Sequence, residues 1–170
     1  MLEILFENEQ LIAINKPHGL LVHRSKMARD VTEFALQQLR DQIGQLVYPS
    51  HRLDRKTAGI LLFAKNKATD QTLQGLFRER NIQKTYQAIA RGYTEDKGSI
   101  DYPLRLENGK VQAANTDYKT LERFEIPLPF GNFQTSRYSL IELYPQTGRF
   151  HQLRKHLNHI LVPNLIEFLI

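Results

Sequence analysis

The sequence predicts an α+β domain in which a mixed, mostly antiparallel sheet is flanked by helices. Strand-like segments outnumber helical segments and do not alternate regularly with them, which argues against a doubly wound sheet. The chain has 170 residues, which is enough for one domain with a sizeable core. Its apolar share of 41% is ordinary for a soluble globular protein.

Short apolar runs between turn-forming residues predict the strands. The clearest is the compact run Ile60 to Ala64, and a turn from Asn15 to Gly19 follows an earlier run. Further strands are expected at residues 4–6 and 11–14 and near 84–91, 100–106, 117–124 and 138–144.

Helices are predicted where apolar residues recur on one face. Asp30 followed by Glu33 resembles a reciprocal N-terminal cap and predicts a helix that continues to about Ile43. A second helix is expected from about residue 68 to 80. A third is expected from about Arg149, with an apolar side made of Phe150, Leu153, Leu157 and Ile160.

Composition excludes several classes of protein. The chain contains no cysteine, so disulfides, thiolate zinc sites and iron–sulfur clusters are ruled out. No run approaches the ~18 apolar residues of a membrane span, and the N-terminus lacks the features of a signal peptide. We therefore expect a cytoplasmic protein that does not enter membranes. Nothing implies a protein partner, and a monomer is expected.

Positive charge is concentrated in two segments. The net charge is +5, but residues 51–92 hold 9 basic and 3 acidic side chains, and residues 146–159 hold 3 basic and none acidic. Runs of charge are also common on solvated surfaces. Clustered positive charge nevertheless favours a polyanionic partner, although charge alone does not separate RNA from DNA or an anionic membrane.

The loop before the run 60–64 contains a carboxylate among cations. Asp54 follows Arg52 and precedes Arg55 and Lys56. Nearby cations favour the ionised form, so Asp54 is expected to be an anion at neutral pH. A positioned carboxylate can attack a sugar anomeric carbon or accept a proton. The alternatives are a surface ion pair and a turn-forming role.

Two further segments are candidates for ligand contacts. Residues 146–156 place Gly148 at the start of a helix whose polar face offers His151, Arg154 and Lys155, while an amphipathic surface helix is the alternative. Metal binding by its histidines is not expected, because their spacing matches no H-E-x-x-H pattern. Lys84-Thr85-Tyr86 lies at the start of a predicted strand. A tyrosine there either packs in the core or on the half-buried surface of the sheet, or stacks on an extruded base.

Four motifs together resemble the RluA family of pseudouridine synthases. The opening motif N-K-P-x-G-x-x-V-H matches residues 15–23, and H-R-L-D followed by Gly59 matches residues 51–54. K-x-Y matches residues 84–86, and T-G-R-x-H-Q-[IL]-R matches residues 147–154. The resemblance covers about residues 1–160 and implies the pseudouridine synthase catalytic fold.

The resemblance implies an isomerisation that needs no cofactor and no metal. The N-glycosidic bond of a uridine breaks, and C5 of the uracil rejoins C1′ of the ribose. Asp54 matches the catalytic aspartate, Tyr86 the tyrosine that packs on the base, and Arg154 the arginine that pairs with the carboxylate. Attack on C1′ and formation of a glycal both remain open. Expected substrate or RNA contacts are Arg52, which fills the space of the flipped uridine, Lys84, Arg149, His151 and Leu153, which lines the pocket.

Three further segments, 23–25, 34–37 and 40–45, resemble members of the family that modify tRNA. They imply a tRNA substrate, at uridine 65, with 23S rRNA as an alternative. Other hypotheses are a tRNA-binding remnant without catalysis and a glycosylase that releases free base. A glycosidase would use two carboxylates, and no second acid lies in a motif.

The C-terminal residues depart from the family pattern. After residue 160 the family continues with H-P-[IL]-x-G-D, and here only Pro163 matches. We therefore expect a catalytic domain over residues 1–160, incomplete at its C-terminus, followed by an atypical apolar tail over residues 161–170. Such an ending leaves open whether this chain is active.

Overall fold

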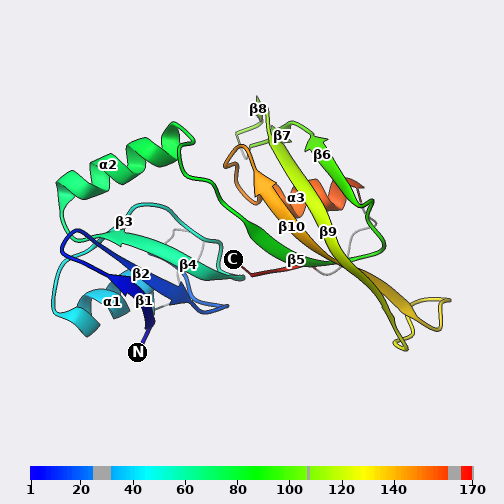
Figure 1. The fold of residues 1–170 in the computed structure, drawn as a ribbon, viewed down its shortest axis with the longest axis horizontal. Coiled ribbons are helices and arrows are strands. Elements are labelled where there is room, and N and C mark those ends of the chain that lie inside the picture. The colour runs from blue at the N-terminus through cyan, green and yellow to red at the C-terminus, as the bar shows by residue number, and fades with distance from the viewer. Residues whose placement is uncertain (25–31, 107, 161–165, 170) are drawn as a thin grey trace. The chain divides into compact units, whose positions relative to one another are not determined.

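The structure is a computed structural model that describes residues 1–24, 32–106, 108–160 and 166–169 (Figure 1). Its backbone divides into two compact units, Met1–Ile82 and Gln83–Leu169. Each unit contains antiparallel strands and at least one helix. No helix within the described ranges combines the length and apolar character needed to cross a membrane.

The first unit is built on three long strands in the order β1, β2 and β4, and the short β3 pairs with β4. Apolar side chains of β2 and β4 face each other across the antiparallel register, with Ile12 opposite Phe63 and Ile14 opposite Leu61. All four are fully buried and form the core of this unit. The strands are β1 (Glu3–Glu7), β2 (Leu11–Lys16), β3 (Tyr48–Pro49) and β4 (Thr57–Ala64).

Two helices belong to the first unit, α1 (Ala35–Ile43) and α2 (Lys67–Arg78). The predicted cap for α1 is wrong: Phe34 is the N-cap residue and makes no side-chain cap bond. Asp30 itself lies outside the described residues. The second helix starts close to the predicted position, where the Asn66 side chain accepts a hydrogen bond from the Thr69 amide.

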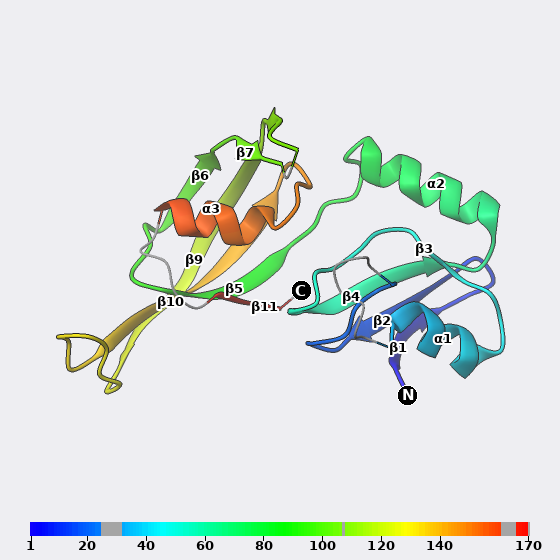
Figure 2. The same ribbon diagram turned by 180° about the vertical axis from the view of Figure 1, so that it is seen from behind.

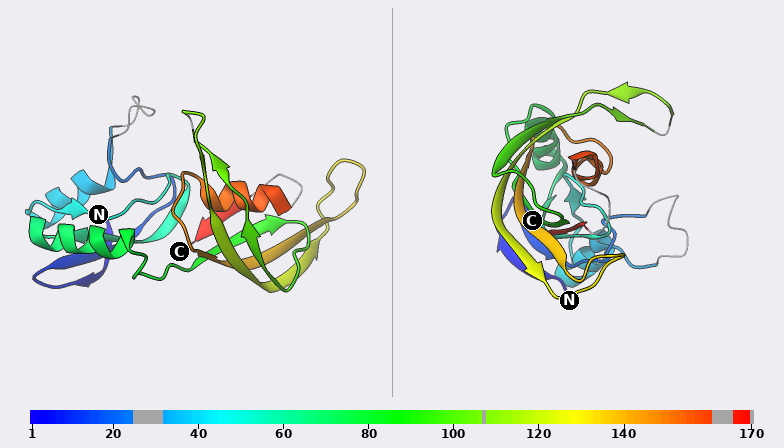
Figure 3. Two further views of the ribbon diagram at one scale, coloured as in Figure 1. Left: turned by 90° about the horizontal axis from the view of Figure 1, so that it is seen from above. Right: turned by 90° about the vertical axis from the view of Figure 1, so that its right-hand side faces the viewer.

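The second unit has an antiparallel sheet in the order β11, β5, β10, β9 and β6. β9 and β10 extend past the ends of the neighbouring strands β5 and β6 as a projecting hairpin (Figure 3). The segment predicted as one strand near 100–106 is divided between β6 and the β7–β8 hairpin. The strands are β5 (Tyr86–Arg91), β6 (Lys97–Asp101), β7 (Leu104–Arg105), β8 (Val111–Gln112), β9 (Asn115–Ile126), β10 (Ser136–Pro145) and β11 (Ile166–Leu169).

Helix α3 (Gln152–Ile160) covers one face of this second sheet (Figure 2). It begins at Gln152 and not near Arg149, because the backbone of His151 is left-handed, with φ of 53°. Phe150 therefore precedes the helix and is not part of its apolar side. Leu157 is fully buried in a core shared with Ala88, Ala90, Ile100, Tyr118, Ile141 and Leu143. The predicted α+β class with a mostly antiparallel sheet is confirmed.

Candidate active site

Asp54 lies in the loop between β3 and β4 of the first unit. It is half-buried, it follows the buried Leu53, and Arg52 beside them is exposed. The carbonyl oxygen of Asp54 accepts a hydrogen bond of 3.0 Å from the amide of Thr57, where β4 begins. Burial of Leu53 thus fixes the loop, while the side chains on either side of it reach the surface.

His51 fastens this loop to β4. Its Nε2 accepts a hydrogen bond of 3.0 Å from the amide of Leu62, and its ring centroid lies 4.7 Å from that of Phe77 in α2. Because Nε2 is the acceptor here, the neutral imidazole would hold its proton on Nδ1. This anchoring role was not predicted, although His51 opens the predicted motif.

Lys16, at the end of β2, is a second anchor that the sequence did not predict. Its side chain is fully buried, at 0% exposure. Its Nζ donates hydrogen bonds to three backbone carbonyl oxygens, those of Pro17 (2.9 Å), Leu20 (2.8 Å) and Arg55 (3.4 Å). The pKa of Lys16 is lowered to about 8, because the effect of burial outweighs the opposing effect of the negative charge of Asp54.

Backbone contacts join the same two segments. The amide of Gly19 donates to the carbonyl oxygen of Arg55 at 2.8 Å, and Nε of Arg55 donates back to the carbonyl oxygen of Gly19 at 3.0 Å. Gly19 has φ of 86°, a conformation that favours glycine. The predicted motifs at 15–23 and 51–54 therefore form one interlocked substructure around the Asp54 loop.

In the second unit, the turn before α3 is organised by one buried amide. Gln152 is 4% exposed and all of its hydrogen-bonding positions are filled. Its Oε1 accepts from the hydroxyl of Thr147 (2.7 Å) and the amide of Arg149 (2.9 Å). Its Nε2 donates to the carbonyl oxygen of Asn115 (3.0 Å) and the hydroxyl of Thr116 (2.9 Å).

This turn positions the basic residues predicted at residues 147–154. Nη2 of the exposed Arg154 lies 2.8 Å from Nδ1 of His151, so these two candidates are in contact. Nε of Arg149 donates to the carbonyl oxygen of Ala113 at 3.1 Å, which ties the turn to the segment before β9. The ring of His151 stacks on that of Phe150, with centroids 3.8 Å apart.

Tyr86 and Leu153 pack against the same core. Both are partly buried and pack against the cluster that contains Ala88 and Leu143. Tyr86 opens β5 opposite Leu143, and Lys84, also partly buried, lies two residues before it. A tyrosine that is held by the core but only partly buried is suited to present its ring to a ligand.

The candidate residues are thus divided between the units. Asp54 and Arg52 belong to the first, whereas Tyr86, Leu153, Arg154, Lys84, Arg149 and His151 belong to the second. The pairing of Arg154 with Asp54 stays a prediction. In the part of the chain that the structure describes, no group of three or more His, Asp or Glu side chains is arranged to hold a metal ion.

Comparison with known proteins identifies a family. A sequence profile described as RNA pseudouridylate synthase matches residues 10–159. Tyr86, Asp54 and Arg154 all lie within the matched region, as do the other candidate residues.

Similar proteins of two bacteria share the name tRNA pseudouridine synthase C. That of Haemophilus influenzae is 47% identical over 96% of this chain and 73% of its own length. That of Pasteurella multocida is 48% identical over 96% of this chain and 72% of its own length. These relatives are therefore longer than the 170 residues compared.

Two solved human structures have a similar fold. Human RNA Pseudouridylate Synthase Domain Containing 4 has a TM-score of 0.69 and 29% identity, covering 98% of this chain and 66% of the other. Human RNA Pseudouridylate Synthase Domain Containing 1 has a TM-score of 0.77 and 22% identity, covering 99% and 76%. Both confirm the fold expected from the motifs.

Proposed function

Since the chain belongs to the RNA pseudouridylate synthase family and its RluA branch, we propose that it converts uridine to pseudouridine in tRNA, with Asp54 as the essential carboxylate. The observation that supports this most directly is the Asp54 loop itself. A half-buried carboxylate lies there in the family motif, on a loop held by Lys16, Gly19 and His51.

The proposed reaction is an isomerisation whose atoms balance without a co-reactant. The bond between ribose C1′ and uracil N1 breaks, and the detached uracil turns within the pocket. C5 then forms a bond to C1′, C5 loses its proton, and N1 gains one. Asp54 either bonds covalently to C1′ or removes a ribose proton to give a glycal. In both routes a carboxylate that keeps a fixed position lowers the barrier.

The other candidates have supporting roles in this proposal. Tyr86 stacks on the uracil, Leu153 lines the pocket, and Arg154 pairs with the Asp54 carboxylate. Arg52 occupies the space that the flipped uridine leaves in the RNA. Lys84, Arg149 and His151 contact the RNA substrate, where cationic side chains bind phosphates.

The proposal is tested with Asp54→Asn, which keeps the size of the side chain and removes its charge. An unmodified tRNA transcript is incubated with the protein, digested to nucleosides and analysed by mass spectrometry coupled to chromatography. We expect no detectable pseudouridine and a tRNA affinity within a few-fold of wild type. Asp41→Asn is the matched control, because Asp41 is an exposed acid on α1 of the same unit.

The products also separate the competing functions. Free uracil would identify a glycosylase. A wild-type chain that binds tRNA and leaves its uridines unchanged would indicate a binding remnant. Near wild-type turnover by Asp54→Asn would overturn the role of Asp54 while leaving the family assignment intact.

We place the target at uridine 65 of tRNA, in a cytoplasmic and monomeric enzyme. The three segments that resemble tRNA-modifying members support this target, and the names of the relatives support tRNA as the substrate. Mapping of pseudouridine by chemical labelling and primer extension tests the position. Modification of 23S rRNA in place of tRNA would favour the alternative target, and light scattering during gel filtration tests the monomer.

A further inference from the structure

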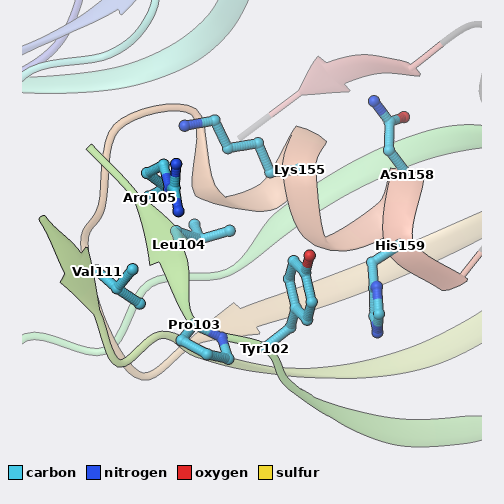
Figure 4. A pocket seen from close by; sticks show the side chains of 8 residues that line it. All are labelled: Tyr102, Pro103, Leu104, Arg105, Val111, Lys155, Asn158 and His159. Carbon is cyan, nitrogen blue, oxygen red and sulfur yellow. The ribbon is translucent and has the colours of Figure 1, made fainter. Parts of the chain in front are cut away.

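A groove of about 590 Å³ lies in the second unit between α3 and the segment that leads through β7 and β8. None of the described residues that line it belongs to the four sequence motifs, although Lys155 directly follows the last one. Figure 4 shows the Tyr102 and His159 rings face to face, with Arg105 and Lys155 further along the groove. Its lining includes Tyr102, Leu104, Arg105, Lys155, Asn158 and His159.

One wall of the groove is a single face of α3. Lys155, Asn158 and His159 are spaced at i, i+3 and i+4, so their side chains share one side of the helix. The opposite side of α3 holds Leu157 in the core. The same helix that closes the core of the second unit therefore presents this row of polar groups to solvent.

The other wall is fixed to the fold by hydrogen bonds. Nε2 of the buried His156 lies 3.0 Å from the carbonyl oxygen of Tyr102, and the Tyr102 amide donates to the carbonyl oxygen of Ala114 at 3.2 Å. The rings of Tyr102 and His159 stack, with centroids 3.8 Å apart and planes inclined by 16°. Buried Leu104 holds the chain just before Arg105. The groove is thus formed before any ligand arrives.

The chemistry of the lining favours a ligand that is rich in hydrogen-bond acceptors and negatively charged. The Arg105 guanidinium, the Lys155 ammonium and the Asn158 amide all supply N–H donors. Among the described residues that line the groove, none is acidic. Asp101, the acidic neighbour of Tyr102 in the chain, is exposed and lies outside the lining. Phosphate oxygens meet this description, and guanidinium and ammonium groups are their usual protein partners.

We propose that this groove binds the sugar–phosphate backbone of the RNA substrate at a nucleotide other than the one that reacts. Arg105 and Lys155 contact phosphates, and the Tyr102–His159 pair lies against a ribose or an unpaired base. This assignment rests on the proposed function, because it takes RNA as the substrate. An open groove with an aromatic pair suits a polymer that passes through it better than a small anion, which would need an enclosing site.

The test is the double variant Arg105→Gln with Lys155→Gln, assayed with an unmodified tRNA transcript. Each lost phosphate contact should make the slope of log affinity against log salt shallower by about 0.7 to 0.9. We expect tRNA binding to weaken by roughly 10-fold at moderate salt and KM to rise in parallel, with kcat within twofold of wild type. A rise in KM alone indicates lost substrate binding that is equal in the ground and transition states.

The matched control is Lys97→Gln with Lys119→Gln. These exposed lysines are paired across β6 and β9, on the strand faces opposite to buried Ile100 and Tyr118. The control removes the same charge from the same unit. If both double variants weakened tRNA binding equally, the effect would come from the overall positive charge of the unit and not from the groove, which would overturn the proposal. Unchanged tRNA affinity and salt dependence in the groove variant would also overturn it.

Thermal unfolding and the combined assay results keep the outcomes distinct. Thermal unfolding of each variant, and of the single substitutions Arg105→Gln and Lys155→Gln, shows whether the fold is intact. If the wild-type chain forms no pseudouridine but the groove variant still loses tRNA affinity, the proposed function fails and the groove assignment stands. If pseudouridine forms and the groove variant binds normally, only the groove assignment fails.

Discussion

The buried ammonium group of Lys16 and the carboxylate of Asp54 interact electrostatically. Burial lowers the Lys16 pKa and the charge of Asp54 partly opposes this, so that the resulting pKa is about 8. The same ammonium group donates to the carbonyl oxygens of Pro17 and Leu20. Lys16 therefore connects the turn after β2 with the loop of the candidate carboxylate. The role that this implies for Lys16 is to position the Asp54 loop without touching the substrate.

Replacing Lys16 with methionine should weaken both folding and catalysis. Lys16→Met removes the shared donor of three part-buried carbonyl oxygens, those of Pro17, Leu20 and Arg55, and an unsatisfied buried group costs about 1–3 kcal/mol. Relief of the buried charge offsets part of this cost, so we expect a net loss of about 1–3 kcal/mol in the free energy of unfolding. Turnover should fall at least 10-fold with little change in tRNA affinity. Lys67→Met, at the exposed start of α2, should change neither quantity appreciably.

The pH dependence of stability offers an independent check on Lys16. Its pKa is about 8 in the folded chain and 10.5 in an unperturbed lysine. Between these values the unfolded chain binds more protons, so the stability of wild type relative to Lys16→Met should rise with pH. The rise should approach about 1.4 kcal/mol per pH unit between pH 8 and 10.5 and be absent below pH 8. A difference that stays constant across this window in urea titrations would show that Lys16 titrates normally.

Salt should weaken tRNA binding steeply. The basic segments 52–91 and 149–155 are predicted to neutralise phosphates, and each contact contributes a slope of about −0.7 to −0.9 in log affinity against log salt. Binding measured from tens to hundreds of millimolar salt gives the slope directly. An affinity that does not change over this range would contradict a phosphate interface, whatever the catalytic result.

The start of α1 is fixed by tertiary contacts that local sequence does not encode. The first helix was expected from a side-chain cap at Asp30, but α1 begins at Ala35. The amides of Ala35 and Leu36 donate to the carbonyl oxygens of Leu21 and Val22, which lie far away in the sequence. Tertiary partners thus satisfy the free amides of the first turn, and local sequence contains no signal for them.

The site was predicted only in part, for a related reason. Asp54 stood out because a carboxylate among cations, within a family motif, is a local signal. Lys16 and Gln152 lie in the same motifs, but their burial could not be predicted. Lysine is almost never fully buried unless its charge has partners, and here the partners are backbone carbonyl groups brought together by folding. The union of the motifs at 15–23 and 51–54 likewise depends on strand pairing between β2 and β4.

A glycine in the second unit should not tolerate a side chain. A Cβ at Gly98 would lie 2.7–2.9 Å from ring atoms of Tyr118, which packs in the core. Gly98→Ala should therefore destabilise the chain by about 1–3 kcal/mol, as overpacking does. In α2, a Cβ at Gly75 would meet nothing closer than 4.0 Å, so Gly75→Ala should stabilise by about 0.5–1 kcal/mol. Opposite shifts of the thermal midpoint are expected, and a neutral Gly98→Ala would show that the Tyr118 ring moves at little cost.

The buried amide of Gln152 should be the most sensitive position in the turn before α3. Gln152→Leu keeps the approximate volume but leaves the Thr147 hydroxyl, the Arg149 amide and the Asn115 carbonyl without this partner. Each orphaned buried group costs about 1–3 kcal/mol, although some regain water. We expect a loss of at least about 2 kcal/mol in the free energy of unfolding.

The matched variant is Gln146→Leu in the same turn, since Gln146 is exposed and its side-chain amide donates exposed hydrogen bonds to Asp117 Oδ2 and the Tyr144 carbonyl oxygen. It should cost less than about 1 kcal/mol. Gln152→Glu separates the two sides of the amide, because a carboxylate still accepts from Thr147 and Arg149 but has no proton to donate to Asn115. At pH 8 the free energy of unfolding of Gln152→Glu should be lower than that of wild type and of Gln152→Leu. It should rise again at lower pH, where the buried carboxyl group is protonated. If Gln152→Leu were as stable as Gln146→Leu in urea titrations, the four hydrogen bonds would not be what holds Arg149, His151 and Arg154 in place.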